Sequence, residues 1–172
     1  GVLERINVQG KVIHSLSKKD VEKAVNYFLK NNISNIAICF LHSYINPNHE
    51  IEAEKIINKI NSNIKVSLSS NLIREFREYE RTSTTCINAY IQETITNYIN
   101  EFILGFKNKG YRKTFFINQS AGGLLSAKTA KLKPVTSLMS GPAGGVVSTS
   151  FVGKIENIKN LIAFDMGGTS TD

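Results

Sequence analysis

The predicted fold is decided by the segment Leu161-Ile-Ala-Phe-Asp165-Met-Gly167-Gly168-Thr169-Ser170-Thr171-Asp172, where an apolar run gives way to an acid, two glycines and a cluster of hydroxyls. Residues 161–164 have the length and apolar character of a buried strand, and Asp165 follows at its carboxyl end, where open α/β sheets bind ligands. Gly167 and Gly168 permit a tight turn whose N–H groups can approach a phosphate. The segment therefore predicts a phosphate-binding hairpin.

The side chains around this turn suit a nucleotide. The hydroxyls of Thr169, Ser170 and Thr171 add hydrogen-bond donors, and Asp165 can reach a magnesium ion directly or through water. The structural alternative is a glycine-rich β-turn with polar caps, in which Asp165 only caps the turn that follows it. The residues 165–172 by themselves fit both interpretations.

Upstream, apolar runs alternate with amphipathic stretches, as in an α/β protein. Residues 35–41 form a continuous apolar run, which predicts a central parallel strand buried on both faces. Residues 53–60 carry apolar side chains at helical spacing, and a short strand at residues 64–68 completes a right-handed strand–helix–strand unit. We therefore expect a mostly parallel sheet flanked by helices.

The same periodicities predict the remaining elements. His49 and Glu50 are expected to begin the helix before residue 53, with Glu50 at its positive end. The longest helix is expected from about Ile87 to Phe106, with Gly110 as its stop. Further elements are a strand pair at residues 3–8 and 11–14, a helix capped by Ser17, a strand at 113–118 and a short helix at 126–132.

Two more glycine clusters stand at positions where a ligand could bind. Gly122 and Gly123 come just beyond the carboxyl end of the strand at 113–118. Ser140-Gly-Pro-Ala-Gly-Gly145 opens a helix that runs to about Val152, with Pro142 at its first position. The alternative for this second cluster is a glycine-rich helix start that serves packing alone.

Five segments of the chain resemble the hydantoinase/oxoprolinase family. Residues 165–172 resemble the family's second phosphate loop, and four further segments match in the same order as in the family. These are Asn46-Pro-Asn-His-Glu50, Arg77-Glu-Tyr-Glu-Arg-Thr-Ser-Thr-Thr85, Asn88-Ala-Tyr90 and Ser140-Gly-Pro-Ala-Gly-Gly-Val146. The resemblance extends over nearly the whole chain, which would be an internal part of a longer family member.

The resemblance implies part of a lobe of the actin-like (ribonuclease H-like) ATPase fold. Its expected parts are the end of the family's N-terminal region (1–83), the start of the hydantoinase A domain (84–156), and the first strand and phosphate loop of the second lobe (157–172). Residues 140–151 would be the helix that connects the lobes. The expected nucleotide-binding residues are Gly122, Gly123, Ser140, Gly141, Gly144, Gly167, Gly168, Thr169, Ser170 and Thr171.

The implied chemistry is ATP-dependent hydrolysis of a cyclic amide, such as 5-oxoproline or a hydantoin, with ATP and Mg²⁺ as cofactors. Asp165 would be the catalytic residue and the magnesium ligand. The alternatives are an ATP-dependent ketone carboxylase subunit of the same family and a noncatalytic actin-like nucleotide-binding module. Expected partners are a small cyclic amide, the remainder of the polypeptide and a second hydantoinase subunit. The isolated chain is expected to be inactive.

The segment Arg77-Glu-Tyr-Glu-Arg81 leaves two roles open. The resemblance implies either contacts with the substrate or an ion-pair network that braces the long helix, and we favour bracing.

Composition limits the other functions. The net charge of +7 comes from scattered lysines rather than from a basic stripe, so we expect no nucleic-acid partner. Cys39 and Cys86 form neither a metal-binding spacing nor a disulfide framework. No apolar run is long enough to span a membrane, and a cytoplasmic location is expected.

Overall fold

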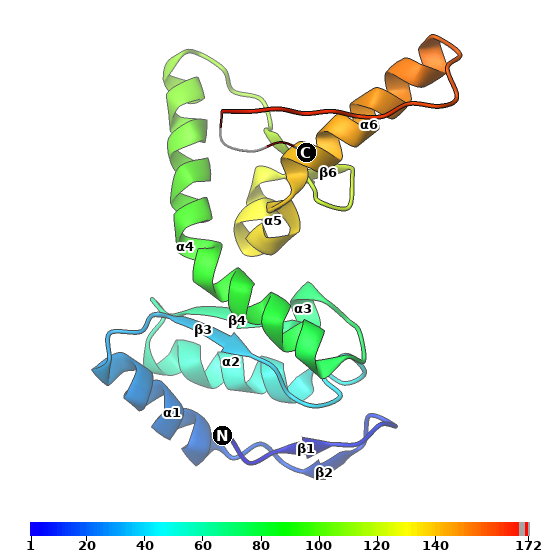
Figure 1. Cartoon of the computed structure of the whole chain (residues 1–172). Coiled ribbons are helices and arrows are strands. Elements are labelled where there is room, and N and C mark those ends of the chain that lie inside the picture. The colour runs from blue at the N-terminus through cyan, green and yellow to red at the C-terminus, as the bar shows by residue number, and fades with distance from the viewer. Residues whose placement is uncertain (169–170, 172) are drawn as a thin grey trace. The chain divides into compact units, whose positions relative to one another are not determined.

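The structure, a computed structural model, describes residues 1–168 and 171. The chain divides into two compact units, unit 1 (Gly1–Glu93) and unit 2 (Thr94–Asp172), and each is described by itself. Both contain helices and two-stranded sheets, which confirms the α/β class (Figure 1). The prediction of a mostly parallel sheet is wrong for the described residues. Of their three sheets, only the one formed by β3 (Asn35–Ile38) and β4 (Lys65–Leu68) is parallel.

Unit 1 begins with the predicted strand pair and the predicted capped helix. Strands β1 (Arg5–Ile6) and β2 (Val12–His14) pair antiparallel across a turn at Gly10, whose φ is +78°. Helix α1 (Lys18–Lys30) starts where the Ser17 hydroxyl accepts a hydrogen bond from the Asp20 N–H (3.3 Å).

The core of unit 1 is the predicted strand–helix–strand unit. Helix α2 (Asn48–Ile60) connects β3 to β4 and packs on one face of their sheet (Figure 1). Strand β3 is shorter than predicted, because the chain turns after Ile38 and His42 adopts a left-handed φ of +58°. The buried hydrophobic residues of this core are Leu16, Val21, Val25, Ile36, Ile38, Ala53, Ile57, Ile64 and Leu68.

The long helix was correctly predicted, but it starts earlier than its apolar periodicity. Following the short helix α3 (Ser69–Leu72), helix α4 (Glu78–Asn108) has 31 residues, and Gly110 follows it with a φ of +88°. The boundary between the two units lies inside this helix. In unit 1, the Asn88 amide donates to the Ser67 hydroxyl (3.0 Å), so the first part of α4 lies against β4.

Unit 2 is built around an antiparallel hairpin, of which the sequence predicted the first strand but not the second. Strand β5 (Phe116–Asn118) pairs with β6 (Leu124–Ser126), followed by α5 (Ala127–Leu132), a 3-10 turn η1 (Pro134–Ser137) and α6 (Ser140–Ile155). The predicted short helix is therefore present, and Ser126 caps it. Pro142 is the third residue of α6 rather than the first.

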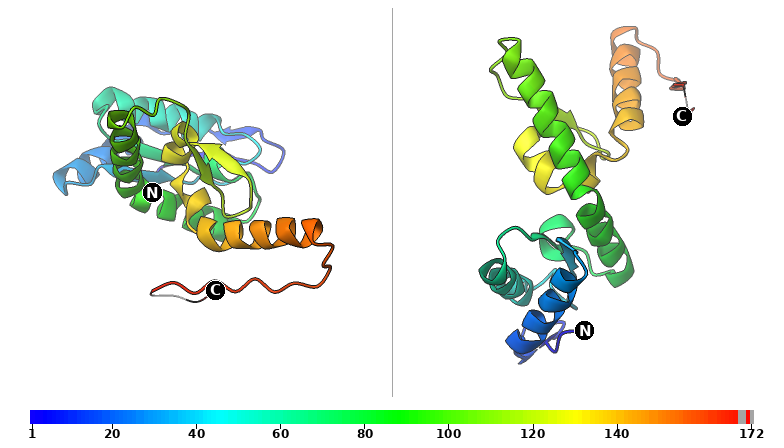
Figure 2. Two further views of the ribbon diagram at one scale, coloured as in Figure 1. Left: turned by 90° about the horizontal axis from the view of Figure 1, so that it is seen from above. Right: turned by 90° about the vertical axis from the view of Figure 1, so that its left-hand side faces the viewer.

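The predicted strand at residues 161–164 is absent. After α6 the chain turns back and runs alongside that helix as an extended segment (Figures 1 and 2). Among the described residues no strand pairs with residues 161–164, so their backbone groups form no ladder and Ile162 is 93% exposed. The apolar character of residues 161–164 predicts burial, but no sheet of the described residues includes them. Thr169, Ser170 and Asp172 lie outside the described residues.

Candidate functional site

Three predicted site residues, Gly122, Gly123 and Gly144, line one cavity in unit 2. The cavity has a volume of about 290 Å³ and lies between the β5–β6 turn and the first turns of α6, and we call it the hairpin cavity. Within the described part of the chain, no charged side chain belongs to its lining. The lining consists of Asn118, Gln119, Gly122, Gly123, Leu124, Ala143, Gly144, Val147 and Ser148.

The glycine pair closes the β5–β6 hairpin. Gly122 and Gly123 have φ values of +84° and +82°, a region that residues with side chains rarely adopt. The Gly122 N–H donates to the Gln119 carbonyl (3.1 Å), and the Gln119 N–H donates to the Gly123 carbonyl (3.0 Å). The glycines therefore have a structural role in the turn, and the same turn forms one wall of the cavity.

Ser120 connects this turn to the start of α6 by two hydrogen bonds. Its N–H donates to the Thr136 carbonyl (2.7 Å), and its hydroxyl accepts a hydrogen bond from the Met139 N–H (3.0 Å). Met139 immediately precedes Ser140, the first residue of α6. Ser120 therefore connects the two walls of the cavity through its backbone and its side chain.

Gly144 lets the hairpin approach α6 closely. A Cβ atom at this position would lie 3.2 Å from the Asn118 Nδ2 atom, tighter than an ordinary van der Waals contact. By contrast, Gly141 has nothing within 4 Å of its Cβ position, so packing gives no reason for a glycine there. Neither Ser140 nor Gly141 lines the hairpin cavity.

The acid and the second glycine pair lie apart from this cavity. Asp165, Gly167 and Gly168 are exposed and are not part of its lining. Met166 forms an antiparallel bridge with Thr171, so the chain reverses direction across the glycine pair, as predicted. Within residues 1–168 and 171, no group of three or more His, Cys, Asp or Glu could hold a metal, so Asp165 offers a single carboxylate.

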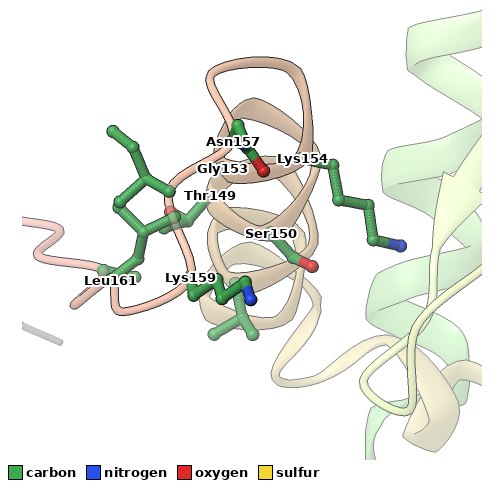
Figure 3. Close-up of a pocket in the computed structure, with 10 residues that line it drawn as sticks. Thr149, Ser150, Gly153, Lys154, Asn157, Lys159 and Leu161 are labelled. Atoms are coloured by element: carbon green, nitrogen blue, oxygen red, sulfur yellow. The ribbon is translucent and has the colours of Figure 1, made fainter.

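A second, larger cavity of about 760 Å³ lies between the end of α6 and the returning segment (Figure 3). Thr149, Ser150, Lys154 and Lys159 give it a polar and basic lining. The ammonium groups of Lys154 and Lys159 point in different directions in Figure 3 and do not converge on one point. Gly153 is needed here for packing, because a Cβ atom would overlap the Leu161 side chain and lie 3.0 Å from the Ile158 carbonyl.

Unit 1 contains a buried charged group that sequence reasoning missed. Glu50 is 0% exposed, and its carboxylate accepts hydrogen bonds from the Phe40 N–H (3.0 Å), the Ser69 hydroxyl (2.6 Å) and the Ser70 N–H (2.9 Å). We expected Glu50 at the positive end of the helix but did not recognise that its side chain is on the buried face. It lies three and seven residues before Ala53 and Ile57, which places it on the buried face of α2.

Arg81 completes this network from helix α4. It is 0% exposed and donates to the Ser43 hydroxyl (2.5 Å) and the Phe40 carbonyl (2.8 Å), while its guanidinium lies 5.4 Å from the centre of the Tyr44 ring. Arg77 instead stays exposed and pairs with Glu80 at 3.5 Å. For Arg81 the structure therefore favours the bracing role over the substrate-contact role. We call Ser43, Glu50, Ser69, Ser70 and Arg81 the buried network.

Two solved structures of ATP-dependent enzymes contain the fold of this chain. One is an acetone carboxylase (TM-score 0.87, 30% identity), of which the match covers 99% of this chain and 24% of the other. The other is the ATP-dependent caprolactamase from Pseudomonas jessenii (TM-score 0.86, 30% identity), with 99% and 25% covered. The fold is therefore that of one segment of such enzymes.

The sequence comparisons define the family. Residues 81–172 match the hydantoinase/oxoprolinase family, and residues 1–61 match the hydantoinase/oxoprolinase N-terminal region. The chain belongs to the hydantoinase/oxoprolinase family, which confirms the resemblance.

Individual relatives are much longer than the chain. An uncharacterised protein of Methanocaldococcus jannaschii is 41% identical over 98% of this chain and 25% of its own length. The 5-oxoprolinase of Saccharomyces cerevisiae is 37% identical over 100% of this chain and 13% of its own length. The chain thus spans a quarter or less of these relatives. Within the described residues, no helix is long and apolar enough to cross a membrane.

Proposed function

We propose that this chain is part of an ATP-dependent enzyme that opens the ring of a cyclic amide. The observation that carries the proposal is the family match over residues 81–172, which includes Asp165 and the glycine pair that follows it. Two similar solved structures are ATP-dependent enzymes, one of them a caprolactamase, and a 5-oxoprolinase is among the relatives.

Asp165 and the turn after it are the proposed nucleotide site. Mg²⁺ is usually bound by one or two carboxylates together with substrate phosphates, so the single exposed carboxylate of Asp165 fits such an ion. Gly167 and Gly168 carry no Cβ atom that would keep a phosphate from their N–H groups. In the proposal, further donors come from Thr169, Ser170 and Thr171, and from Ser140 and Gly141 at the positive end of α6.

In this proposal ATP supplies the phosphoryl group that activates the amide carbonyl oxygen, so that water can open the ring. The role of the chain's residues is to position phosphates and neutralise their charge, which is most of what phosphoryl transfer requires. The lobe would belong to an actin-like fold, and a second subunit and a cytoplasmic location remain part of the proposal. Several relatives are named as subunits, among them the caprolactamase subunit alpha of Pseudomonas jessenii.

The test is phosphate release by the full-length protein with and without 5-oxoproline, hydantoin or a lactam. Wild-type protein should release phosphate only when one of these amides is present. The Asp165→Ala variant should lose turnover at least about a hundredfold, because the magnesium ion that would neutralise the phosphates loses its carboxylate ligand. Glu156→Ala, which removes another exposed acid of unit 2, is the matched control and should keep wild-type rates. Wild-type rates in Asp165→Ala would remove Asp165 from the mechanism.

A second candidate is ATP-dependent carboxylation of a ketone. It is favoured by the similarity to the acetone carboxylase structure. This enzyme would release phosphate in the presence of a ketone and bicarbonate, but not with a cyclic amide alone. Phosphate release that depends on no small substrate would instead indicate a noncatalytic nucleotide-binding module.

A further inference from the structure

We propose that the hairpin cavity binds the substrate ring, and that it selects an uncharged cyclic amide over one that carries a carboxylate. This inference rests on the proposed function, and it reassigns Gly122, Gly123 and Gly144 from the nucleotide to the substrate.

Within the part of the chain that the structure describes, the lining has no charged side chain that could neutralise an anion. Among the described residues, neither Lys nor Arg contributes to it, and its polar side chains are the amides of Asn118 and Gln119 and the hydroxyl of Ser148. A triphosphate or a carboxylate removed from water needs a positive partner, whereas a neutral ring does not. The cavity therefore fits a neutral polar ligand better than it fits phosphates.

Asn118 and Gln119 have amide groups that are available for a ligand. Neither side chain forms a hydrogen bond with the part of the chain that the structure describes, although Asn118 Nδ2 and Gln119 Nε2 both lie against the glycines of the cavity wall. Each primary amide offers an N–H donor beside a carbonyl acceptor. A cis amide in a small ring presents the complementary acceptor and donor on neighbouring atoms, so one side chain can form two hydrogen bonds with it.

The remaining wall suits the carbon atoms of such a ring. Leu124, Ala143 and Val147 provide apolar contacts, and no aromatic side chain in the described lining offers a surface for stacking a purine base. The volume of about 290 Å³ lies at the low end of ligand pockets, as expected for a small ring. A cyclic amide thus matches this cavity better than adenine does.

The experiment uses the full-length protein and a matched pair of ligands, 2-pyrrolidinone and 5-oxoproline, which differ only by the carboxylate. Calorimetry should show that 2-pyrrolidinone binds at least about tenfold more tightly than 5-oxoproline. Replacing an amide by the nearly isosteric leucine, in Asn118→Leu or Gln119→Leu, should weaken 2-pyrrolidinone binding about tenfold through the lost hydrogen bonds. The affinity for ATP should stay within twofold of the wild type in both variants.

The control is Asn108→Leu, which makes the same change at the exposed end of α4, outside the lining of the cavity. It should leave both affinities unchanged, and urea unfolding should show that all three variants remain folded. The inference is overturned if 2-pyrrolidinone fails to bind, if 5-oxoproline binds more tightly, or if Asn118→Leu and Gln119→Leu lower the affinity for ATP instead. Tight and variant-sensitive 2-pyrrolidinone binding without any ATP binding would support this inference and refute the proposed function.

Discussion

The two units place their polar groups in opposite environments. In unit 1, Glu50 and Arg81 are fully buried, and their hydrogen bonds join α2 and α4 to the carboxyl ends of β3 and β4. In unit 2, the side-chain amides of Asn118 and Gln119 line a cavity, and they have no hydrogen-bond partner among the described residues. Ligands usually bind at the carboxyl ends of parallel strands, yet here hydrogen bonds within the protein occupy the polar groups at those ends. In our proposals unit 2 therefore binds the ligands, and unit 1 serves as the scaffold.

The largest expected effect comes from breaking the buried network. Arg81→Ala removes the buried guanidinium that donates to the Ser43 and Ser69 hydroxyls and to the Phe40 carbonyl. We expect the free energy of unfolding to fall by about 3–5 kcal/mol, because several buried hydrogen bonds from a charged group are lost, each worth about 1.5–3 kcal/mol. Urea unfolding of the chain measures this loss.

The matched control for this prediction lies four residues earlier in the same segment. Arg77→Ala removes the same side chain from an exposed position, where it pairs only with Glu80. It should change the free energy of unfolding by less than about 1 kcal/mol. Equal losses for the two variants would contradict the scaffold role of the buried network.

A smaller effect is expected where unit 2 holds its returning segment. Gly153→Ala would force the Leu161 side chain and the Ile158 carbonyl away from α6, at a cost of about 1–3 kcal/mol. Gly145→Ala lies in the same helix with nothing within 4 Å of its Cβ position, and it should stabilise the helix by about 0.5–1 kcal/mol. Hydrogen exchange of residues 153–163 should rise in the first variant only. Unchanged exchange there would show that the segment does not pack on α6.

The smallest effect concerns an exposed contact in unit 1. A hydrogen bond from the Leu3 N–H (3.0 Å), and next the Ser17 hydroxyl, lower the pKa of the Asp20 carboxyl below its ordinary value of 3.8. Because the folded state binds this proton less readily than the unfolded state, the stabilisation is present above about pH 4 and is lost as the pH falls. Asp20→Asn should therefore slightly lower the urea midpoint at pH 7 but not at pH 2. A larger change of the urea midpoint at pH 2 than at pH 7 would contradict a lowered pKa for Asp20.

Elements with long periodic patterns could be predicted from sequence. Helices α1, α2 and α4 form where apolar residues recur at helical spacing. Short apolar runs were ambiguous, because burial depends on what covers them. Residues 35–38 and 161–164 have similar composition, yet the first pairs with β4 under α2, and the second has no pairing strand among the described residues. Strand β6, with three residues, was too short for its pattern to be seen.

The candidate site was predicted only in part. The glycines at 122, 123 and 144 were singled out and do meet in one cavity, because a glycine pattern marks tight turns and close approaches wherever they occur. The amides of Asn118 and Gln119 were not singled out, since nothing in a sequence tells an amide that faces a cavity from one that faces solvent. The partners of Arg81 lie 12 to 41 residues away along the chain, so only the fold could identify them.

The two hydrogen bonds of Ser120 have a consequence for the energetics of ligand capture. They join the hairpin turn to η1 and to the start of α6 through hydrogen bonds within the protein, so the fold itself holds the cavity wall in place. A molecule that enters would find its surroundings preorganised, and little conformational entropy would be lost in the protein at that moment. Affinity would then respond to the fit of the ring itself, and entry would require no prior rearrangement of the wall.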